Sequence, residues 1–134
     1  MRKRILVVED DLDLVELLRF NLSNAGFSVL VATDGAEALK KARSQQPDLV
    51  LLDLMLPELD GFAVCEILRR DTSTTSIPII ILTAISSQLA RVAGMGAGAN
   101  DYVTKPFSPK HLLNRIENQF NRTPVPSAPA ATGS

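Results

Sequence analysis

The 134-residue chain has little aromatic side-chain content and almost no cysteine: it contains no tryptophan, one tyrosine and a single cysteine, Cys65. One cysteine cannot form an internal disulfide, so we expect a reducing, cytoplasmic compartment. No apolar run reaches the roughly 18–20 residues that span a bilayer, which argues against membrane insertion. The basic start Met1–Arg4 is followed by the apolar run Ile5–Val8, which is too short for the core of a signal peptide.

Neither sign of charge dominates the sequence, whose formal net charge is −1 with 22% charged residues. This balance provides no basic field, so we expect no direct binding of nucleic acid by this chain. The hydrophobic content of 46% is ordinary for a globular protein, and the length suits one domain.

The last part of the chain differs in composition from the rest. Residues 123–134 contain Pro124, Pro126 and Pro129, mostly small side chains and no charge. Such a segment buries too little apolar surface to offset its ordering entropy. The predicted organisation is one folded domain over residues 1–122 and a flexible Pro/Ala-rich tail or linker over 123–134.

Short β-branched apolar segments alternate with segments of helical spacing. The predicted strands are Ile5–Val8, Ser28–Ala32, Leu49–Leu52, Ile77–Leu82 and Asp101–Thr104. Their continuous apolar character suits strands buried on both faces of a parallel sheet. The first intervening segment carries a stripe typical of a buried helix face: Leu14, Leu17, Leu18 and Leu22. Five strands alternating with five helices predict an α/β fold with a doubly wound, five-stranded parallel sheet.

Acidic residues follow two of the predicted strands. The triplet Glu9–Asp11 follows the first strand, and Asp53 closes the third. In a doubly wound sheet these strands can be neighbours, and ligands bind beyond the carboxyl ends of such strands. Glu9, Asp10 and Asp53 are therefore expected to share a pocket, where clustered carboxylates favour Mg²⁺. Taken alone, the triplet is equally well explained as an exposed helix start.

The other two predicted strands of interest end in residues suited to phosphoryl binding. Thr83 and Ala84 follow the fourth strand, and Lys105–Pro106 follows the fifth. A hydroxyl donates hydrogen bonds and an ammonium supplies positive charge. Each residue alone has a plain alternative, as a strand end or a surface lysine. Their occurrence together with the acids favours one common site.

The motifs just described are arranged as in a known family. They lie in four segments: Ile5–Asp11, Leu51–Gly61, Leu82–Ala84 and Gly98–Phe107. Over about Ile5 to Phe120 the chain resembles receiver domains of two-component response regulators, most closely those of PhoB/OmpR-like transcription factors. The resemblance implies the flavodoxin- and CheY-like (βα)5 fold.

The resemblance also implies the chemistry of the pocket. Asp53 would accept a phosphoryl group from a histidine kinase or phosphotransfer protein. Mg²⁺ would be bound by Asp10, Asp53 and the backbone carbonyl of Met55, with Glu9 acting through water. Lys105 and the backbone N–H of Ala84 would contact the phosphoryl oxygens.

A conformational switch is implied by the same resemblance. Thr83 would move toward the phosphate, Tyr102 would follow as the coupled aromatic residue, and the Lys105–Pro106 peptide bond would be cis. The protein would then control an output partner, or an effector domain not contained in this chain. It would be a phosphoacceptor that promotes its own phosphorylation and dephosphorylation, and not an enzyme with an external substrate.

Two positions depart from the PhoB/OmpR-like pattern. His111 stands where Glu is usual opposite the basic residue at Arg91, and Asn100 replaces a frequent Asp. A homodimer through the fourth helix, fifth strand and fifth helix would therefore depend on Asp101 and Arg115.

Two apolar residues border the implied site. Met55 and Ile85 are expected to restrict water access and prolong the phosphorylated state.

Other functions share the predicted fold. A pseudo-receiver that only binds partners is the main alternative, but such modules usually lose part of the acidic set. A dehalogenase-like phosphatase would normally carry an acid at the position of Met55, and no glycine-rich nucleotide loop follows a strand.

Overall fold

The computed structural model describes residues 2–121, so the predicted tail over 123–134 lies outside the described residues. Five strands alternate with five helices in this range. Their order is β1 (Arg4–Val8), α1 (Leu12–Asn24), β2 (Ser28–Ala32), α2 (Gly35–Gln45), β3 (Leu49–Leu52), α3 (Gly61–Arg70), β4 (Ile79–Thr83), α4 (Gln88–Gly96), β5 (Asp101–Thr104) and α5 (Pro109–Asn121). None of the helices in this range is both long and apolar enough to cross a membrane.

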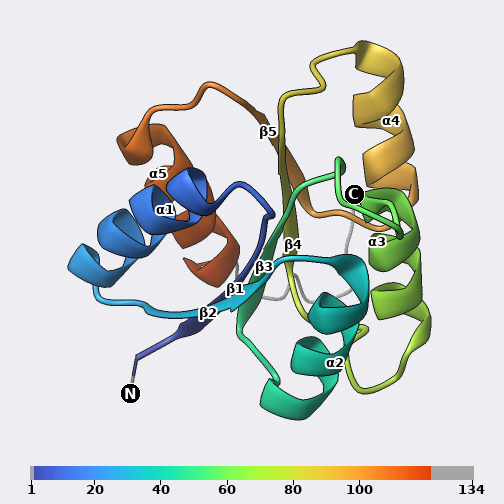
Figure 1. Cartoon of the computed structure of the whole chain (residues 1–134), viewed down its shortest axis with the longest axis horizontal. Coiled ribbons are helices and arrows are strands. Elements are labelled where there is room, and N and C mark those ends of the chain that lie inside the picture. The colour runs from blue at the N-terminus through green and yellow to red at the C-terminus, as the bar shows by residue number, and fades with distance from the viewer. Residues whose placement is uncertain (1, 122–134) are drawn as a thin grey trace, which may run out of the picture.

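All five strands are parallel and lie in the order β2-β1-β3-β4-β5, which confirms the predicted doubly wound sheet. Helices α1 and α5 cover one face, and α2, α3 and α4 cover the other (Figure 1). The chain passes from β1 outward to β2 and then returns across β1 to β3. The strand order therefore reverses between β1 and β3, the place where open α/β sheets bind ligands.

Alternating residues of the strands build two separate cores. On β1, Leu6 and Val8 join the cluster beneath α2 and α3, whereas Ile5 and Val7 join the cluster beneath α1 and α5. These four side chains are at most 1% exposed. Each fully buried aliphatic side chain contributes about 1.5–3 kcal/mol relative to exposure. The strands that carry the site are thus held rigidly from both faces.

Residues suited to capping form the helix ends. Asp34 accepts a hydrogen bond from the backbone N–H of Glu37 at the start of α2. Ser108 caps α5 through the N–H of His111, and Pro109 is its first residue. Gly26 ends α1 with a φ of +95°, a conformation that glycine adopts without strain.

Three predicted details are corrected. The fourth strand begins at Ile79 and not at Ile77, because Pro78 has no N–H to donate to the ladder; the strand also extends to Thr83. The first strand includes Arg4, which pairs with Ser28. Leu17 is 48% exposed, because the buried stripe of α1 runs through Val15, Leu18 and Leu22.

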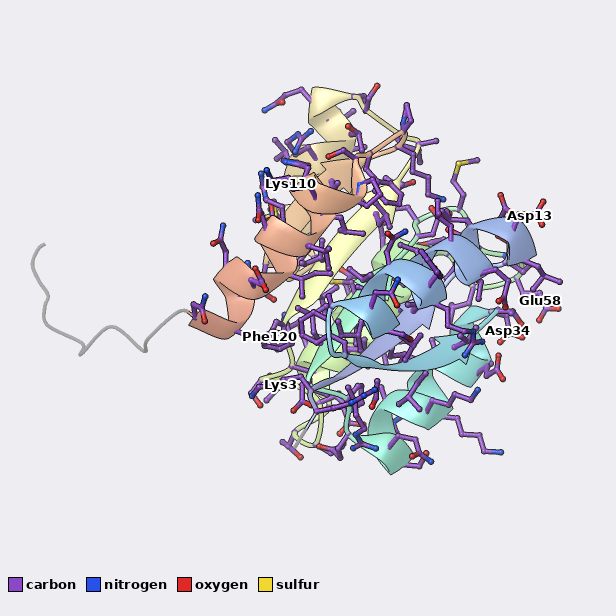
Figure 2. All side chains as sticks on the ribbon, turned by 90° about the vertical axis from the view of Figure 1, so that its left-hand side faces the viewer. Lys3, Asp13, Asp34, Glu58, Lys110 and Phe120 are labelled. Carbon is purple, nitrogen blue, oxygen red and sulfur yellow. The ribbon has the colours of Figure 1, made fainter. Side chains whose placement is uncertain are left out.

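Several acids lie near the carboxyl ends of the strands. Asp13, Asp34 and Glu58 all follow the carboxyl ends of strands and lie at one end of the molecule, whereas Lys3 lies at the other (Figure 2). Acidic side chains therefore lie around the carboxyl ends of β1 and β3, between which the strand order reverses.

Candidate functional site

The acids predicted to meet do meet, because β1 and β3 are neighbours in register. Val8 pairs with Leu52, and each strand then continues by one residue into an acid. The backbone N–H of Glu9 donates to Ala32 (2.9 Å), and that of Asp53 donates to Val8 (3.1 Å). These bonds hold both carboxylates at the same edge of the sheet.

Three carboxylates form a cluster there. One oxygen from each of Glu9, Asp10 and Asp53 lies within 4.8 Å of the others. Glu9 and Asp53 are 3% and 6% exposed, whereas Asp10 is exposed to solvent. Two buried carboxylates with a third at the opening fit a hard cation that retains several waters, as Mg²⁺ does.

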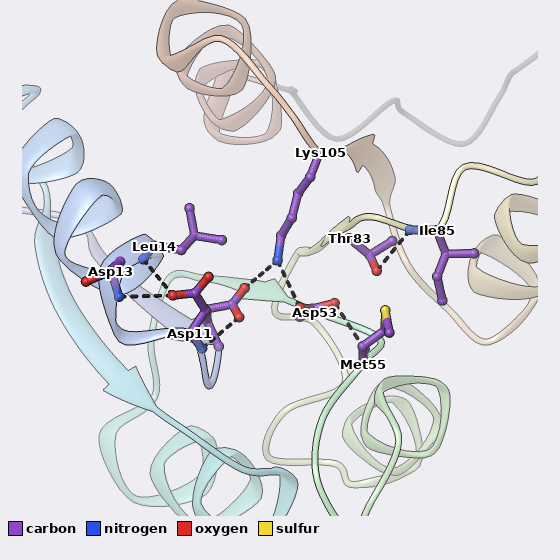
Figure 3. A network of polar contacts seen from close by, with 9 residues as sticks. Asp11, Asp13, Leu14, Asp53, Met55, Thr83, Ile85 and Lys105 are labelled. Atoms are coloured by element: carbon purple, nitrogen blue, oxygen red, sulfur yellow. Dashed lines mark hydrogen bonds and ion pairs between the residues drawn. The ribbon is translucent and has the colours of Figure 1, made fainter.

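Lys105 neutralises part of this charge. Its Nζ donates to Glu9 Oε1 at 2.7 Å and to Asp53 Oδ2 at 2.9 Å, as Figure 3 shows. Burial raises the pKa of Glu9 above its usual range, although the Lys105 ammonium opposes this shift. For Lys105 itself burial would lower the pKa, but hydrogen bonds to Glu9 and Asp53 raise it. The lysine is therefore charged beside both acids.

The segment after Lys105 has the geometry that the resemblance implies. The Lys105–Pro106 peptide bond is cis. The Lys105 backbone N–H donates to the carbonyl of Thr83 at 2.8 Å. This bond fixes the end of β5 against the end of β4 and directs the lysine across the pocket.

Asp11 has a different role from its two neighbours. Its Oδ1 accepts from the backbone N–H groups of Asp13 (3.1 Å) and Leu14 (3.3 Å), so it is the N-cap of α1. Its own N–H donates to Glu9 Oε2 at 3.0 Å, which lowers the pKa of Glu9 against the effect of burial. Asp11 thus caps α1 with its side chain, as Figure 3 shows, and orients Glu9 with its backbone N–H.

The loop after Asp53 packs closely against the acid. The backbone N–H of Met55 donates to Asp53 Oδ1 at 3.0 Å, and the side chain of Met55 is exposed. Gly61 begins α3 directly behind the loop. A Cβ at Gly61 would lie 2.6 Å from both the carbonyl oxygen of Asp53 and the Cα of Leu54.

Thr83 and Tyr102 are joined through one residue. Thr83 is fully buried at the end of β4, and its Oγ1 lies 3.5 Å from the backbone N–H of Ile85. The hydroxyl of Tyr102 donates to the carbonyl of Ile85 at 2.6 Å. Ala84, between them, is exposed. Sequence reasoning named Thr83 and Tyr102 but missed Ile85 as the link, because the contact is made through its backbone.

Arg91 also has a contact that the sequence did not indicate. Its guanidinium lies 4.7 Å from the centre of the Tyr102 ring, and Nη1 donates to the Tyr102 carbonyl at 3.1 Å. Such stacking depends on the packing of α4 against β5, for which a residue pattern carries no signal.

Several of the residues considered for a homodimer make contacts within their own chain. Arg115 forms a bidentate pair with Asp101, one bond of 2.5 Å joining Nε to Oδ2. Burial would raise the pKa of Asp101, but Arg115 lowers it below its usual range. The Asn100 side-chain oxygen accepts from Arg69 Nη2 at 2.5 Å and from the Ile79 N–H at 2.8 Å. His111 is exposed.

The fold and the pocket together define a doubly wound α/β domain with an acidic site, opposed by a lysine, where the strand order reverses. Residues 5–117 match the family of response regulator receiver domains. The chain therefore belongs to this family of two-component signalling proteins.

Known proteins of similar sequence and structure are response regulators too. The chain is 45% identical over 131 residues to the alkaline phosphatase synthesis transcriptional regulatory protein PhoP of Bacillus subtilis, an alignment covering 98% of this chain and 53% of that protein. The chain thus spans about half the length of this relative. Its structure is similar to that of a response regulator from Chloroflexus aurantiacus (TM-score 0.87, 38% identity, covering 91% of this chain and 100% of that one).

A third comparison bears on the metal. The receiver domain of the sensor histidine kinase PA1611 from Pseudomonas aeruginosa PAO1 is similar in structure, with a TM-score of 0.82 and 33% identity over 88% of this chain and 97% of that one. That structure is described with a magnesium ion coordinated in its active-site cleft. Receiver domains bind Mg²⁺ at an acidic site, and this chain carries an acidic cluster.

Proposed function

We propose that this receiver domain accepts a phosphoryl group on Asp53 from a histidine kinase or a phosphotransfer protein. The observation that carries the proposal is the position of Asp53: it is 6% exposed, closes β3, and lies within 4.8 Å of two further carboxylates and 2.9 Å from Lys105 Nζ. A lone strand-end acid would need neither the cluster nor the half-buried ammonium of Lys105.

In the proposed reaction an oxygen of Asp53 attacks the phosphorus of a phosphohistidine. The phosphorus–nitrogen bond breaks, its electron pair returns to the imidazole ring, and the product is an acyl phosphate. Such transfer depends mainly on positioning and charge neutralisation. Lys105 already lies beside Asp53 and would donate to the phosphoryl oxygens, and the backbone N–H of Ala84, an exposed residue, would add a second donor.

The metal fits the same pocket. Asp10, Asp53 and the Met55 carbonyl would bind Mg²⁺, with Glu9 acting through water. When bound, the ion supplies positive charge that offsets repulsion between the acids and the anionic donor. Dephosphorylation of Asp53 by water in the same pocket belongs to this proposal.

The proposed output is a shift between two arrangements of the β4–α4 region. Phosphate beside Thr83 favours the arrangement in which its hydroxyl donates to a phosphoryl oxygen, and Ile85 transmits the change to Tyr102. The output would be a partner protein or an effector domain following the receiver portion, residues 1–122, through the 123–134 linker. A homodimer through α4, β5 and α5 is one form of output that sedimentation would detect.

Intact-protein mass spectrometry with acetyl phosphate tests the acceptor. We expect wild type to gain the mass of one phosphoryl group only when Mg²⁺ is present, and Asp53→Asn to gain none. Asp13→Asn is the matched control, because Asp13 is an exposed acid at the start of α1 and should leave the adduct unchanged. An adduct that persists in Asp53→Asn, or its absence in wild type with both acetyl phosphate and beryllofluoride, would contradict the proposal and favour a pseudo-receiver.

A further inference from the structure

Strand β2 lies at one edge of the sheet and has only β1 as a neighbour. Its sequence, Ser28–Ala32, is apolar after the serine and contains neither a charge nor a proline, and its first four residues are only half-buried. An edge strand presents a row of backbone N–H and carbonyl groups that another chain can pair with. Short apolar segments of high β propensity are especially prone to such pairing.

The outward backbone groups of β2 belong to Val29 and Val31. The Ser28 N–H and the Ala32 carbonyl bond to residues that flank β1, each at 2.9 Å, so the even-numbered residues face the sheet. Consecutive residues of a strand direct their hydrogen-bonding groups to opposite sides. The odd-numbered residues therefore direct theirs away from the sheet.

Two side chains of α2, one turn apart, cover the carboxyl half of this edge. Lys41 Nζ donates to the Val31 carbonyl. Glu37 Oε1 accepts from the Thr33 N–H at 2.8 Å, and its Oε2 lies 3.2 Å from Lys41 Nζ. The bond from Thr33 lowers the pKa of Glu37, so this pair is ionised at neutral pH. Within residues 2–121, no side chain bonds to the outward groups of Val29.

The β2 edge is complementary to itself. In an antiparallel pair of two β2 strands centred on Leu30, Val29 of each copy faces Val31 of the other, and each such pair exchanges two N–H···O bonds. The two Leu30 side chains then lie opposite one another and make apolar contact. A two-fold axis relates the copies, so the interface closes on a dimer. One acceptor in each pair is the Val31 carbonyl, which Lys41 occupies.

We infer that Glu37 and Lys41 block the pairing of β2 with a second copy of this chain, and that an antiparallel β2–β2 pair is the interface that forms without them. The Lys41 ammonium takes the side of the Val31 carbonyl that a partner N–H would need. It would also approach the identical ammonium of the second copy, which is unfavourable. Neither side chain belongs to the proposed acceptor site, so the inference does not depend on phosphorylation.

Sedimentation velocity of the full chain at several concentrations tests the block. Lys41→Met keeps the apolar stem and loses the donor, and we expect it to associate at concentrations about tenfold lower than wild type, since freed backbone acceptors gain partners. Lys41→Arg keeps a donor and should behave as wild type does. Lys40→Met is the matched control, because Lys40 is the adjacent, exposed lysine of α2. Urea unfolding establishes that each variant is folded.

Amide hydrogen exchange followed by NMR locates the interface. In monomeric wild type the amides of Val29 and Val31 should exchange rapidly, whereas that of Leu30, which faces β1, should be protected. In Lys41→Met the two valine amides should become protected as the concentration rises. A folded Lys41→Met that associates no more than wild type, equal association of Lys40→Met, or association that leaves the valine amides unprotected would each overturn the inference. Slow exchange of both valine amides in the wild-type monomer would overturn it whatever the stability of the variant.

Discussion

Met55 contacts the proposed acceptor, Asp53, through its backbone and not through its side chain. Its backbone N–H contacts Asp53, and its side chain is 59% exposed on the same side of the acid as Ile85 (Figure 3). We propose that a thioether at this position limits the approach of ordered water to the acyl phosphate. An amide would instead hold a water by hydrogen bonds.

We therefore expect Met55→Asn to shorten the lifetime of phosphorylated Asp53 by about tenfold, equivalent to about 1.4 kcal/mol in the barrier. Phosphate release after removal of acetyl phosphate measures this lifetime. Leu17→Asn is the control, since Leu17 is an exposed apolar residue in the middle of α1. A half-life unchanged in Met55→Asn would contradict the role assigned to the side chain.

Asp71 has an unusual titration of its own. The backbone N–H and the hydroxyl of Ser73 donate to it and Arg43 pairs with it at 2.7 Å, which together lower its pKa from 3.8 to about 2. Because the folded-state pKa lies below the unfolded value, the ionised group stabilises the fold above about pH 4. That contribution is lost as the pH falls toward 2.

We expect Asp71→Asn to flatten the dependence of unfolding free energy on pH between about pH 5 and pH 2. Urea unfolding at several pH values measures the slope. Asparagine can still accept from the Ser73 N–H, so the variant isolates the charge. A slope identical to that of wild type would show that Asp71 does not titrate with folding.

At the scale of elements, the start of α3 determines how closely the loop after Asp53 can pack. Gly61 is the helix residue whose added Cβ would meet backbone on two sides, at 2.6 Å each. Backbone atoms cannot rotate away as a side chain can. Gly61→Ala should therefore lower the unfolding free energy by about 1–3 kcal/mol and slow formation of the Asp53 adduct.

Gly96 provides the matched comparison within a helix. A Cβ there has no neighbour within 4 Å, so Gly96→Ala should stabilise the fold by about 0.5–1 kcal/mol and leave adduct formation unchanged. Urea unfolding and intact mass measure both quantities for the two variants. Equal stability of Gly61→Ala and wild type would mean that the loop can shift.

The strands could be predicted from the sequence because their composition is continuous and their ends are marked. Leu49–Leu52 is apolar on both faces and Asp53 interrupts it, so both the strand and its terminal acid are evident. Parallel topology then brings Glu9 to Asp53 by geometry alone. β4 begins at Ile79, two residues after the start of the predicted strand, because Pro78 inside the apolar run cannot donate a hydrogen bond to the neighbouring strand.

Side-chain partners across the fold could not be predicted in the same way. The sequence predicts a common site for Lys105 and the acids, but not that Lys105 Nζ pairs with Glu9, 96 positions away. Arg91 stacks on Tyr102 only because α4 packs beside β5. Leu17 shows the same limit within a helix, where hydrophobicity alone does not define the side that faces the sheet. These contacts depend on rotamers chosen by tertiary packing.

For the whole molecule, we expect the acidic cluster to make stability depend on divalent cations. Bound Mg²⁺ would offset repulsion between Glu9, Asp10 and Asp53, and it would bind only the folded chain. At free Mg²⁺ about 100 times its Kd, the unfolding free energy should rise by about 2.7 kcal/mol. Thermal unfolding with Mg²⁺ and then with EDTA measures the gain.

Asp10→Asn should lose most of this gain, because Asp10 is the exposed member of the cluster and pairs with no cation among residues 2–121. Asp13→Asn should keep it. A Mg²⁺-dependent rise in melting temperature of equal size in Asp10→Asn would exclude Asp10 as a ligand.

The far end of α5 lies against the beginning of the chain. Phe120 packs on Phe27 with ring centres 5.7 Å apart, and Lys3 Nζ lies 5.4 Å from the Phe120 ring centre. Figure 2 shows Lys3 and Phe120 together, opposite the end that carries Asp13 and Asp34. A polypeptide that continues beyond α5 therefore departs from the pole remote from Asp53. Its first residues start too far away to contact Asp53, so a change at the acid would reach them through the strands and helices that lie between.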